Sequence, residues 1–188
     1  PHLTVVGEPS VGPDPHQAVL TYPGPKPEVT VNAQTGDLRI SQQGRFGIFG
    51  SRHLAIDLRI SPAVSWSIKL NSGATNTNLK LTDVKVTSIE SNTGASRLDI
   101  IVGLPEGIVP IRANGGALTV RVHRPSGTEV SVQVSGGAVN LSADGRHTGA
   151  IGSARWESNG YANAKHAYAI EINGRACPVT IATDVPAK

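Results

Sequence analysis

The residues of this chain whose types suit acid–base chemistry are three scattered carboxylates. Asp83, Glu90 and Asp99 fall within two adjacent segments of the sequence, and two carboxylates about 5–9.5 Å apart form the reacting pair of glycoside hydrolysis. Parallel β-helices often carry such carboxylates on one strand face. One reading of the chain is therefore a carbohydrate-active β-helix enzyme, either a polysaccharide lyase or a hydrolase. The competing reading is that the three side chains are dispersed and solvated.

A second group of residues suits the binding of anions. Arg112, Arg121, His123 and Arg124 lie within thirteen consecutive positions, and a face of this kind attracts an acidic polymer, an anionic lipid surface or an acidic protein. Glu129 lies nearby in the sequence and weakens the positive field. We expect the four residues to form a binding face, with an ordinary solvated strand surface as the alternative.

Metal and cofactor chemistry is not indicated by the sequence. The six histidines form no His-Glu-x-x-His motif and no pair at metal-ligand spacing, and Cys177 is the single cysteine. Neither a Gly-x-Ser-x-Gly elbow nor a Walker-type phosphate loop occurs. The sequence therefore predicts no metal, no cofactor and no enzyme activity, and Cys177 is interpreted as a buried structural thiol.

Charge and hydropathy narrow the class of partner. Lys and Arg number 17 against 14 Asp and Glu, which gives a formal net charge of +3, and the arginines occur singly instead of in runs. A scattered excess of this size argues against nucleic acid as a partner. No stretch approaches the roughly 18 consecutive apolar residues that a membrane span needs.

An internal repeat predicts the elements that position these residues. A tetrapeptide that ends in alanine recurs with its alanines at 74, 95, 117 and 138, so the spacings are 21, 22 and 21 residues. A short alternating segment precedes each copy and another follows it. With 21 glycines and 4% aromatic residues, the composition favours strands with a core of small and β-branched side chains. The sequence predicts an all-β, β-solenoid-like stack of short two-stranded repeats with a period of 21–22 residues.

The turn residues have a structural interpretation. Asn71, Asn92 and Asn114 occupy the same place in successive repeats, and we expect a ladder of hydrogen-bonded amides, because identical polar side chains at one level of a stack can bond to one another. Glycine supplies the positive φ of a tight corner. The turn glycines are expected to lie one above another along the stack: Gly73, Gly94, Gly116 and Gly137.

Alternation along the strands predicts which side chains point inward. Most repeats place their inner residues two apart, whereas Val86 and Ile89 are three apart. Because successive strand residues point to opposite faces, this spacing implies a bulge or a shifted phase.

Residues 1–28 differ in composition from the rest. They hold seven of the 13 prolines, which is typical of an extended linker. We therefore predict a proline-rich linker or tail over residues 1–28 and a single all-β repeat domain over residues 29–188. Because the sequence opens on Pro1 instead of Met, we also expect a missing upstream part that includes a membrane segment, with an artificial start point as the alternative.

Aromatic residues gather near the other end of the sequence. Trp156, Tyr161 and Tyr168 lie within residues 154–168, and we expect this segment to form a C-terminal apolar cap that seals the open end of the stack. Residues 161–167, with three alanines, are the single helix candidate.

Several of these segments resemble one group of bacterial envelope domains. The turns and their flanking strands are similar to the toast-rack type, which includes the C-terminal domain of LiaF-like cell-wall-active antibiotic response proteins and the "putative adhesin" domains; the segments are 66–74, 91–100, 103–107 and 134–141. Three later segments resemble the closing strands of the LiaF-like group: 156–161, 169–174 and 178–181. The resemblance spans about residues 29–182 and implies an all-β stack without an established active site.

The resemblance also implies a location and a kind of function. Toast-rack domains are usually held by an upstream membrane region and have sensing, scaffolding or protein-interaction roles. We therefore expect a non-enzymatic, extracytoplasmic module of the cell envelope that binds a protein partner or an anionic envelope polymer in an adhesin-like manner. Membrane contact is expected only through the upstream tether. A homo-oligomer that forms through unpaired sheet edges is an alternative mode of assembly.

Overall fold

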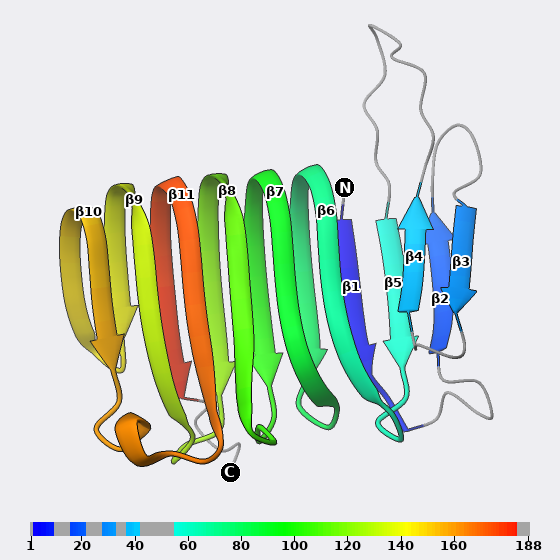
Figure 1. The fold of residues 1–188 in the computed structure, drawn as a ribbon. Helices are drawn as coiled ribbons and strands as arrows, with labels where there is room; N and C mark the ends of the chain where they lie inside the picture. Colours follow the sequence, from blue (N-terminus) through cyan, green and yellow to red (C-terminus); the bar gives the residue numbers. More distant parts are fainter. Residues whose placement is uncertain (1, 10–15, 22–27, 33–36, 42–54, 184–188) are drawn as a thin grey trace, which may run out of the picture.

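The structure is a computed structural model that describes residues 2–9, 16–21, 28–32, 37–41 and 55–183 (Figure 1). Apart from the short 3-10 helix η1 (Tyr161–Asn163), the regular elements of these residues are strands, which confirms the all-β fold class. Within the described part of the chain, no helix has the length and apolar character needed to cross a membrane. The strands are β1 (His2–Gly7), β2 (His16–Thr21), β3 (Glu28–Asn32), β4 (Asp37–Ser41), β5 (Ala55–Ile60), β6 (Ser65–Leu81), β7 (Lys85–Val102), β8 (Ile108–Arg124), β9 (Glu129–Ala143), β10 (Arg146–Glu157) and β11 (Ala167–Thr183).

The long strands are bent in the middle. β6, β7, β8 and β11 each run for 17 or 18 residues straight through a turn-like tetrapeptide and fold back, so that each has a first arm before the bend and a second arm after it (Figure 1). The two strands that the sequence predicts for each repeat are therefore the two arms of one continuous strand. The ladder continues through the bend because turn residues such as Asn71 and Ala74 stay paired with their counterparts on the next strand, Asn92 and Ala95.

One sheet, folded over on itself, contains most of the strands. Its order is β10-β9-β11-β8-β7-β6-β1-β5-β2, and β3 pairs with β4 in a separate two-stranded sheet. The seven strands from β9 to β5 in this order are all parallel to one another. β10 pairs antiparallel with β9 at one edge, and β2 pairs antiparallel with β5 at the other. The stack departs from sequence order at one place, since β11 lies between β8 and β9. A two-residue turn at Asp144 and Gly145 makes β10 the hairpin partner of β9, which leaves the other side of β9 for β11.

The irregular register that the sequence implies near Val86 is present. Trp66 lies opposite Val86 while Ser67 lies opposite Ser88, so Thr87 is an extra residue in β7. The Thr87 hydroxyl donates a hydrogen bond to the Trp66 carbonyl oxygen at 3.1 Å. This bulge restores the inward direction of Ile89, which is 1% exposed.

The prediction that residues 1–28 form a linker is wrong for two segments. β1 pairs in parallel with both β5 and β6, and β2 pairs with β5. Val5 of β1 is 2% exposed and belongs to the core. Neither strand contains proline, so the composition of the whole segment conceals two short stretches that can form sheet hydrogen bonds. The boundary predicted at residue 29 is therefore not a domain boundary.

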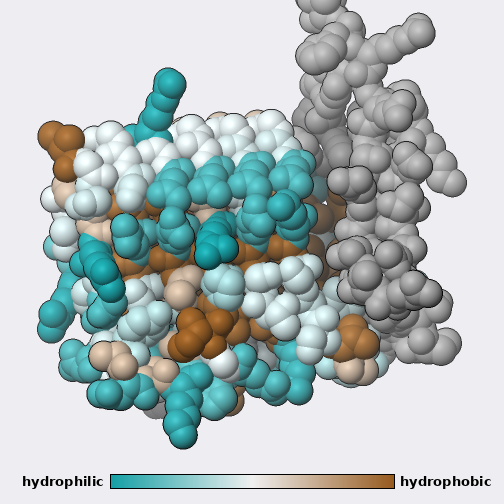
Figure 2. All heavy atoms as spheres, viewed as in Figure 1, coloured by the Kyte–Doolittle hydropathy of each residue, from teal (hydrophilic) through white to brown (hydrophobic). Residues whose placement is uncertain are grey.

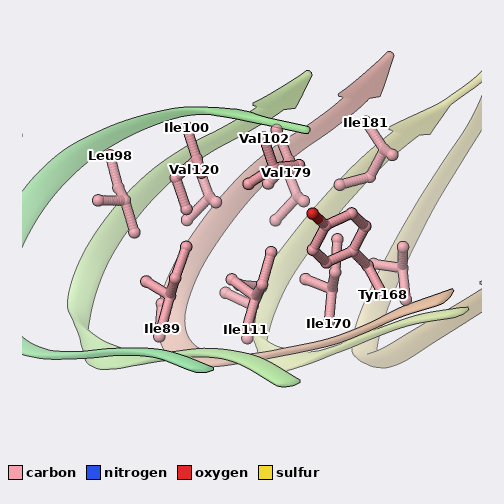
Figure 3. Close-up of a cluster of buried hydrophobic side chains, with 14 of the residues drawn as sticks. Ile89, Leu98, Ile100, Val102, Ile111, Val120, Tyr168, Ile170, Val179 and Ile181 are labelled. Carbon is pink, nitrogen blue, oxygen red and sulfur yellow. The ribbon is translucent and has the colours of Figure 1, made fainter. Parts of the chain in front are cut away.

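The core lies between the two layers of arms. Figure 3 shows Ile89, Ile111 and Ile170 of the first arms facing residues of the second arms, among them Leu98, Ile100, Val102, Val120, Val179 and Ile181. These side chains are at most 3% exposed, and full burial of one such side chain contributes about 1.5–3 kcal/mol. The layers are thus held together by small and branched aliphatic side chains, as the composition predicts.

The aromatic segment expected to form the cap is divided between two places. Ala154 is buried and Trp156 packs against the core from β10, the strand at the end of the stack. Tyr168 instead belongs to β11 and lies inside the stack with 2% of its surface exposed. The helix candidate is reduced to η1, because the chain must turn there to bring β11 back between β8 and β9.

Tyr168 predicts how stability depends on pH. Its hydroxyl donates to the Gly103 carbonyl oxygen at 2.8 Å, and burial raises its pKa above the ordinary value of 10.0. Above about pH 10 the unfolded chain loses the phenol proton while the folded chain keeps it, so the free energy of unfolding falls as pH rises. We expect Tyr168→Phe to cost about 1–2 kcal/mol near neutral pH and to remove part of this alkaline loss. Urea titrations at pH 8 and 10.5 measure both effects, and equal alkaline losses in the two proteins would contradict the assignment.

Candidate binding surfaces

The folded sheet presents two flat outer faces. We call the outer surface of the layer that contains the first arms of β6, β7, β8, β9 and β11 the front face and that of the opposite layer the back face. Because β10 is antiparallel to β9, its second arm belongs to the front layer. Because the strands are in register, side chains form rows that cross them, and hydrophilic rows of this kind are visible in Figure 2. The central front row is Lys69, Glu90, Arg112, Glu171, Gln133 and Arg155. The central back row is Asn78, Asp99, Arg121, Thr180 and Ser142.

An asparagine ladder lies beside the bends on the front face. The Asn92 amide donates to the Asn71 amide oxygen at 3.3 Å, and Asn114 donates to Asn92 at 3.0 Å. Asn173 continues the series by donating to Asn114 at 3.0 Å. Ser135 of β9 lies opposite Asn173 and has no amide with which to extend the ladder. The hydrogen bonds required by the sequence interpretation are thus present, with a fourth member that the repeat did not include.

A fifth turn, residues 173–176, is not among the four that the sequence period predicts. It reads Asn-Gly-Arg-Ala, and its alanine lies 38 residues beyond Ala138, outside the 21–22-residue period. β10 and η1 occupy the intervening sequence. The asparagine at the first position and the alanine at the fourth are the signal that could have identified it.

Three of the four predicted turn glycines, Gly94, Gly116 and Gly137, are explained by close approach and not by positive φ. A Cβ atom on Gly94 would lie 2.5 Å from the Gly73 carbonyl oxygen, and one on Gly116 would lie 2.8 Å from that of Gly94. Gly137 approaches the carbonyl oxygen of Arg175, because the turn of β11 separates it from Gly116. The glycines with positive φ in the described residues lie elsewhere, at 107, 127, 145 and 152.

The front row carries charges of alternating sign. Lys69 pairs with Glu90 at 3.2 Å and Arg112 with Glu171 at 3.6 Å. The Asn92 amide donates to Glu90 at 2.7 Å, and this bond, followed by that from Lys69, lowers the pKa of the Glu90 carboxyl. Because the pairs are exposed, each contributes little to stability. Their effect is to leave the front face close to neutral.

A shallow depression lies on the front face over Ala169. Its volume is about 170 Å³, and Arg112, Glu171 and Arg155 form part of its wall. Pockets for small ligands are typically about 300–1,000 Å³. The depression is therefore too small for an ordinary small-molecule site, and contact over an area suits this face better.

The back face has an excess of positive charge. Arg97 and Arg121 both pair with Asp99, at 3.3 and 3.9 Å, and nearly half of each arginine side chain is exposed. Lys80 lies two positions after Asn78 on the neighbouring strand, and no ion pair of Lys80 is found within the described residues. One carboxylate thus neutralises one of three cations on three adjacent strands.

The four residues predicted to form one binding face do not share a surface. Arg121 and His123 lie together on the back face, whereas Arg112 lies on the front face, with the core between them. Arg124 is 3% exposed and pairs with Asp144 at 2.5 Å. The strand alternation and the bend explain the division, because residues close in sequence point to different sides.

The three carboxylates that suggested a carbohydrate-active site do not converge either. Glu90 lies on the front face beside Lys69, and Asp99 lies on the back face between two arginines. Asp83 is exposed in the connection between β6 and β7. The acid–base pair that glycoside hydrolysis requires is therefore not formed by these residues.

Other titratable groups give no alternative centre in the described part of the chain. No group of three or more His, Cys, Asp or Glu side chains is arranged there to hold a metal ion. Cys177 is fully buried, and burial raises the pKa of its thiol. Because the thiolate is the reactive form, this cysteine is suited to packing and not to nucleophilic chemistry.

Comparison with known proteins supports the toast-rack resemblance. No curated protein is significantly similar to the chain in sequence. A crystal structure from Clostridium sporogenes, described as a "putative cell adhesion protein", matches with a TM-score of 0.78 and 17% identity, over 97% of this chain and 88% of that one. At this identity the match shows a shared fold. The family model described as "N-terminal domain of toast_rack, DUF2154" matches residues 20–123, more than half of the sequence. The chain therefore belongs to the toast_rack N-terminal domain family.

Proposed function

We propose that this chain is a non-enzymatic, extracytoplasmic module of a bacterial envelope protein that binds an anionic envelope polymer through its back face. The observation that carries the proposal is the arrangement of Arg97 and Arg121 around one shared carboxylate, Asp99, with Lys80 on the adjoining strand. The excess cationic charge is exposed and held on strands whose backbone is fixed by neighbours on both sides. A preorganised positive field of this kind attracts an extended anion.

The geometry of the face suits a polymer better than a small ligand. Adjacent strands lie about 4.8 Å apart, and residues on one face recur about every 6.7 Å along each strand. Arg97, Arg121 and Lys80 lie in three successive rows on β7, β8 and β6, so their charges are spread over two directions of a flat surface. A chain of repeating anionic groups can contact several of them at once, which gives avidity without a deep pocket.

Family membership and the fold support the envelope setting. The family model matches residues 20–123, and the similar crystal structure carries a cell-adhesion description. We propose that an upstream tether holds the domain outside the cytoplasm. Protease treatment of intact cells that make the full-length protein tests this location, and complete protection of the domain until the cells are lysed would refute it.

A protein partner is the second candidate for the ligand. The near-neutral front face, with its fixed amide and ion-pair rows, favours contact with a protein surface that has its own hydrogen-bonding groups. Binding of such a partner to the front face should not change when the back-face arginines are replaced. This difference separates the two candidates experimentally.

The back-face proposal is tested with the double variant Arg97→Ala/Arg121→Ala and a soluble poly(glycerol phosphate) as the probe. Two surface charge contacts are worth about 1–2 kcal/mol together, so we expect affinity to fall roughly tenfold. The matched control is Lys69→Ala/Arg112→Ala, which removes the same charge from the front face and should change affinity less than about twofold. Affinity should also fall as salt rises from about 50 to 500 mM. Equal losses in both variants, or no binding by the unaltered chain, would refute the polymer.

A further inference from the structure

The edge strand β10 has a free side. β10 pairs with β9, and no other described strand adds to its outer edge. Its backbone therefore presents unpaired N–H and C=O groups along the edge, and edges of this kind are templates for another strand. Ile151, at the bend of β10, is 93% exposed. A large apolar side chain at the apex of an open edge contributes nothing to the core of a single copy.

The bend restricts which strand can pair with this edge. β10 follows the bend of β9, with partners in both of its arms, from Arg146 opposite Ala143 to Glu157 opposite Ser131. The register shifts between Ala150 and Gly152, so Ile151 has no partner on β9. A straight peptide can therefore pair with one arm only. A strand with the same bend at the same position can pair with both, and β10 of a second copy is such a strand. The opposite edge of the sheet, β2, is a single arm of six residues and cannot match both arms.

We propose that two copies of this chain associate through antiparallel β10–β10 pairing about a two-fold axis at Ile151. The first arm of each β10 then lies beside the second arm of the other, so both layers of the folded sheet continue across the interface. The contact is isologous and closes after two copies. This inference does not depend on the proposed polymer binding, because the interface leaves the back faces of β6, β7 and β8 uncovered.

The side chains of β10 complement themselves in this register. Side chains directly opposite in an antiparallel pair point to the same face. In β10, Thr148 and Trp156 lie opposite the buried residues Leu141 and Val132, so they are on the inner side. Pairing centred on Ile151 sets each Ile151 against its counterpart and places Arg146 opposite the partner's Trp156.

This arrangement completes the exposed end of the core. Trp156 is only partly buried in one copy although it packs against the core. A guanidinium stacked on its ring adds a cation–π contact of about 0.5–2 kcal/mol. On the outer side, His147 lies opposite the partner's Arg155, where both side chains remain in water.

Sedimentation velocity of the full chain tests the interface. We expect a dimer at about 100 μM and a dissociation constant at least about a hundredfold higher for Ile151→Lys, because two apolar side chains leave the axis and two like charges replace them. The matched control, Val19→Lys, places the same charge on the other edge strand at a residue that is 59% exposed and should leave the dimer intact. A chain that is monomeric at this concentration overturns the proposal, as does equal weakening by both variants. If the chain is monomeric, Arg146 acts as an inward-pointing charge that prevents another strand from pairing with the β10 edge.

A cross-link tests the register independently of affinity. Opposite residues of an antiparallel pair have Cα atoms about 4.5–5.5 Å apart, which allows a disulfide. Ile151→Cys should therefore form a disulfide-linked dimer under mild oxidation, whereas the unaltered chain should not, because Cys177 is fully buried. Val19→Cys is the control for random collision. Cross-linking of Val19→Cys as fast as that of Ile151→Cys would overturn the assigned axis.

Discussion

Replacing Gly94 by alanine is expected to destabilise the fold by about 2–4 kcal/mol. The new Cβ atom would lie 2.5 Å from the Gly73 carbonyl oxygen of the preceding turn. That oxygen belongs to backbone fixed in the sheet, so it cannot move aside as a flexible side chain would. Two adjacent strands must separate locally, and the hydrogen bonds of the turn and of the asparagine ladder weaken with them. The midpoint of guanidinium chloride unfolding, followed by circular dichroism, measures the effect.

Gly73→Ala is the matched control for this substitution. Gly73 occupies the same turn position on β6, but a Cβ atom there has nothing within 4 Å. Neither glycine has left-handed backbone, so alanine causes no conformational strain at either position. We expect Gly73→Ala to change stability by less than about 0.5 kcal/mol or to stabilise the protein by up to about 1 kcal/mol. Similar losses at both positions would show that the turns are not stacked as described.

The substitution Asp144→Asn is expected to cost about 3–5 kcal/mol, because it leaves a buried charge without its counter-ion. Asp144 pairs with Arg124 at 2.5 Å, and the arginine side chain is 3% exposed. The Arg124 Nε atom already has no hydrogen-bond partner in the described residues. Asparagine tolerates the positive φ of 45° at this position, so the turn itself should persist. Thermal and urea unfolding measure the loss.

Removing the arginine should cost less than removing its partner. In Arg124→Met the remaining Asp144 carboxylate is 32% exposed and can be solvated, while the methionine fills the apolar part of the space. We expect a loss of about 1–2 kcal/mol. A larger loss for Arg124→Met than for Asp144→Asn would show that the cost of burying the guanidinium is not the dominant effect.

The parts of the fold that repeat locally could be predicted from the sequence. The spacing of the turns, the asparagine ladder and the irregular register at Val86 all follow from short-range rules. In each case the residues that meet in space occupy equivalent positions in adjacent repeats. A sequence period is therefore enough to predict which residues lie opposite each other, as Asn92 and Asn114 do.

The composition of the two outer faces could be predicted only in part. Arg121 and His123 lie two residues apart on one strand, and their common face follows from alternation. Arg112 was placed with them because it is close in sequence, but the bend at Asn114–Ala117 puts it on the other layer. Arg97 and Lys80, which add positive charge to the same face as Arg121, lie on other strands. Their proximity follows from the stacking of successive repeats and not from the spacing of the arginines in the sequence.

By itself, the sequence determined that the chain forms a stack of short β repeats with glycine-containing turns at a fixed period, because periodic alternation and small turn residues act within one repeat. The tertiary structure decided which strands lie next to one another: β1 and β5 extend one layer beyond β6, and β11 enters between β8 and β9. These choices depend on burying apolar faces that are distant in sequence. Several parallel pairings satisfy the same local pattern, and the lowest free energy among them is a property of the whole core.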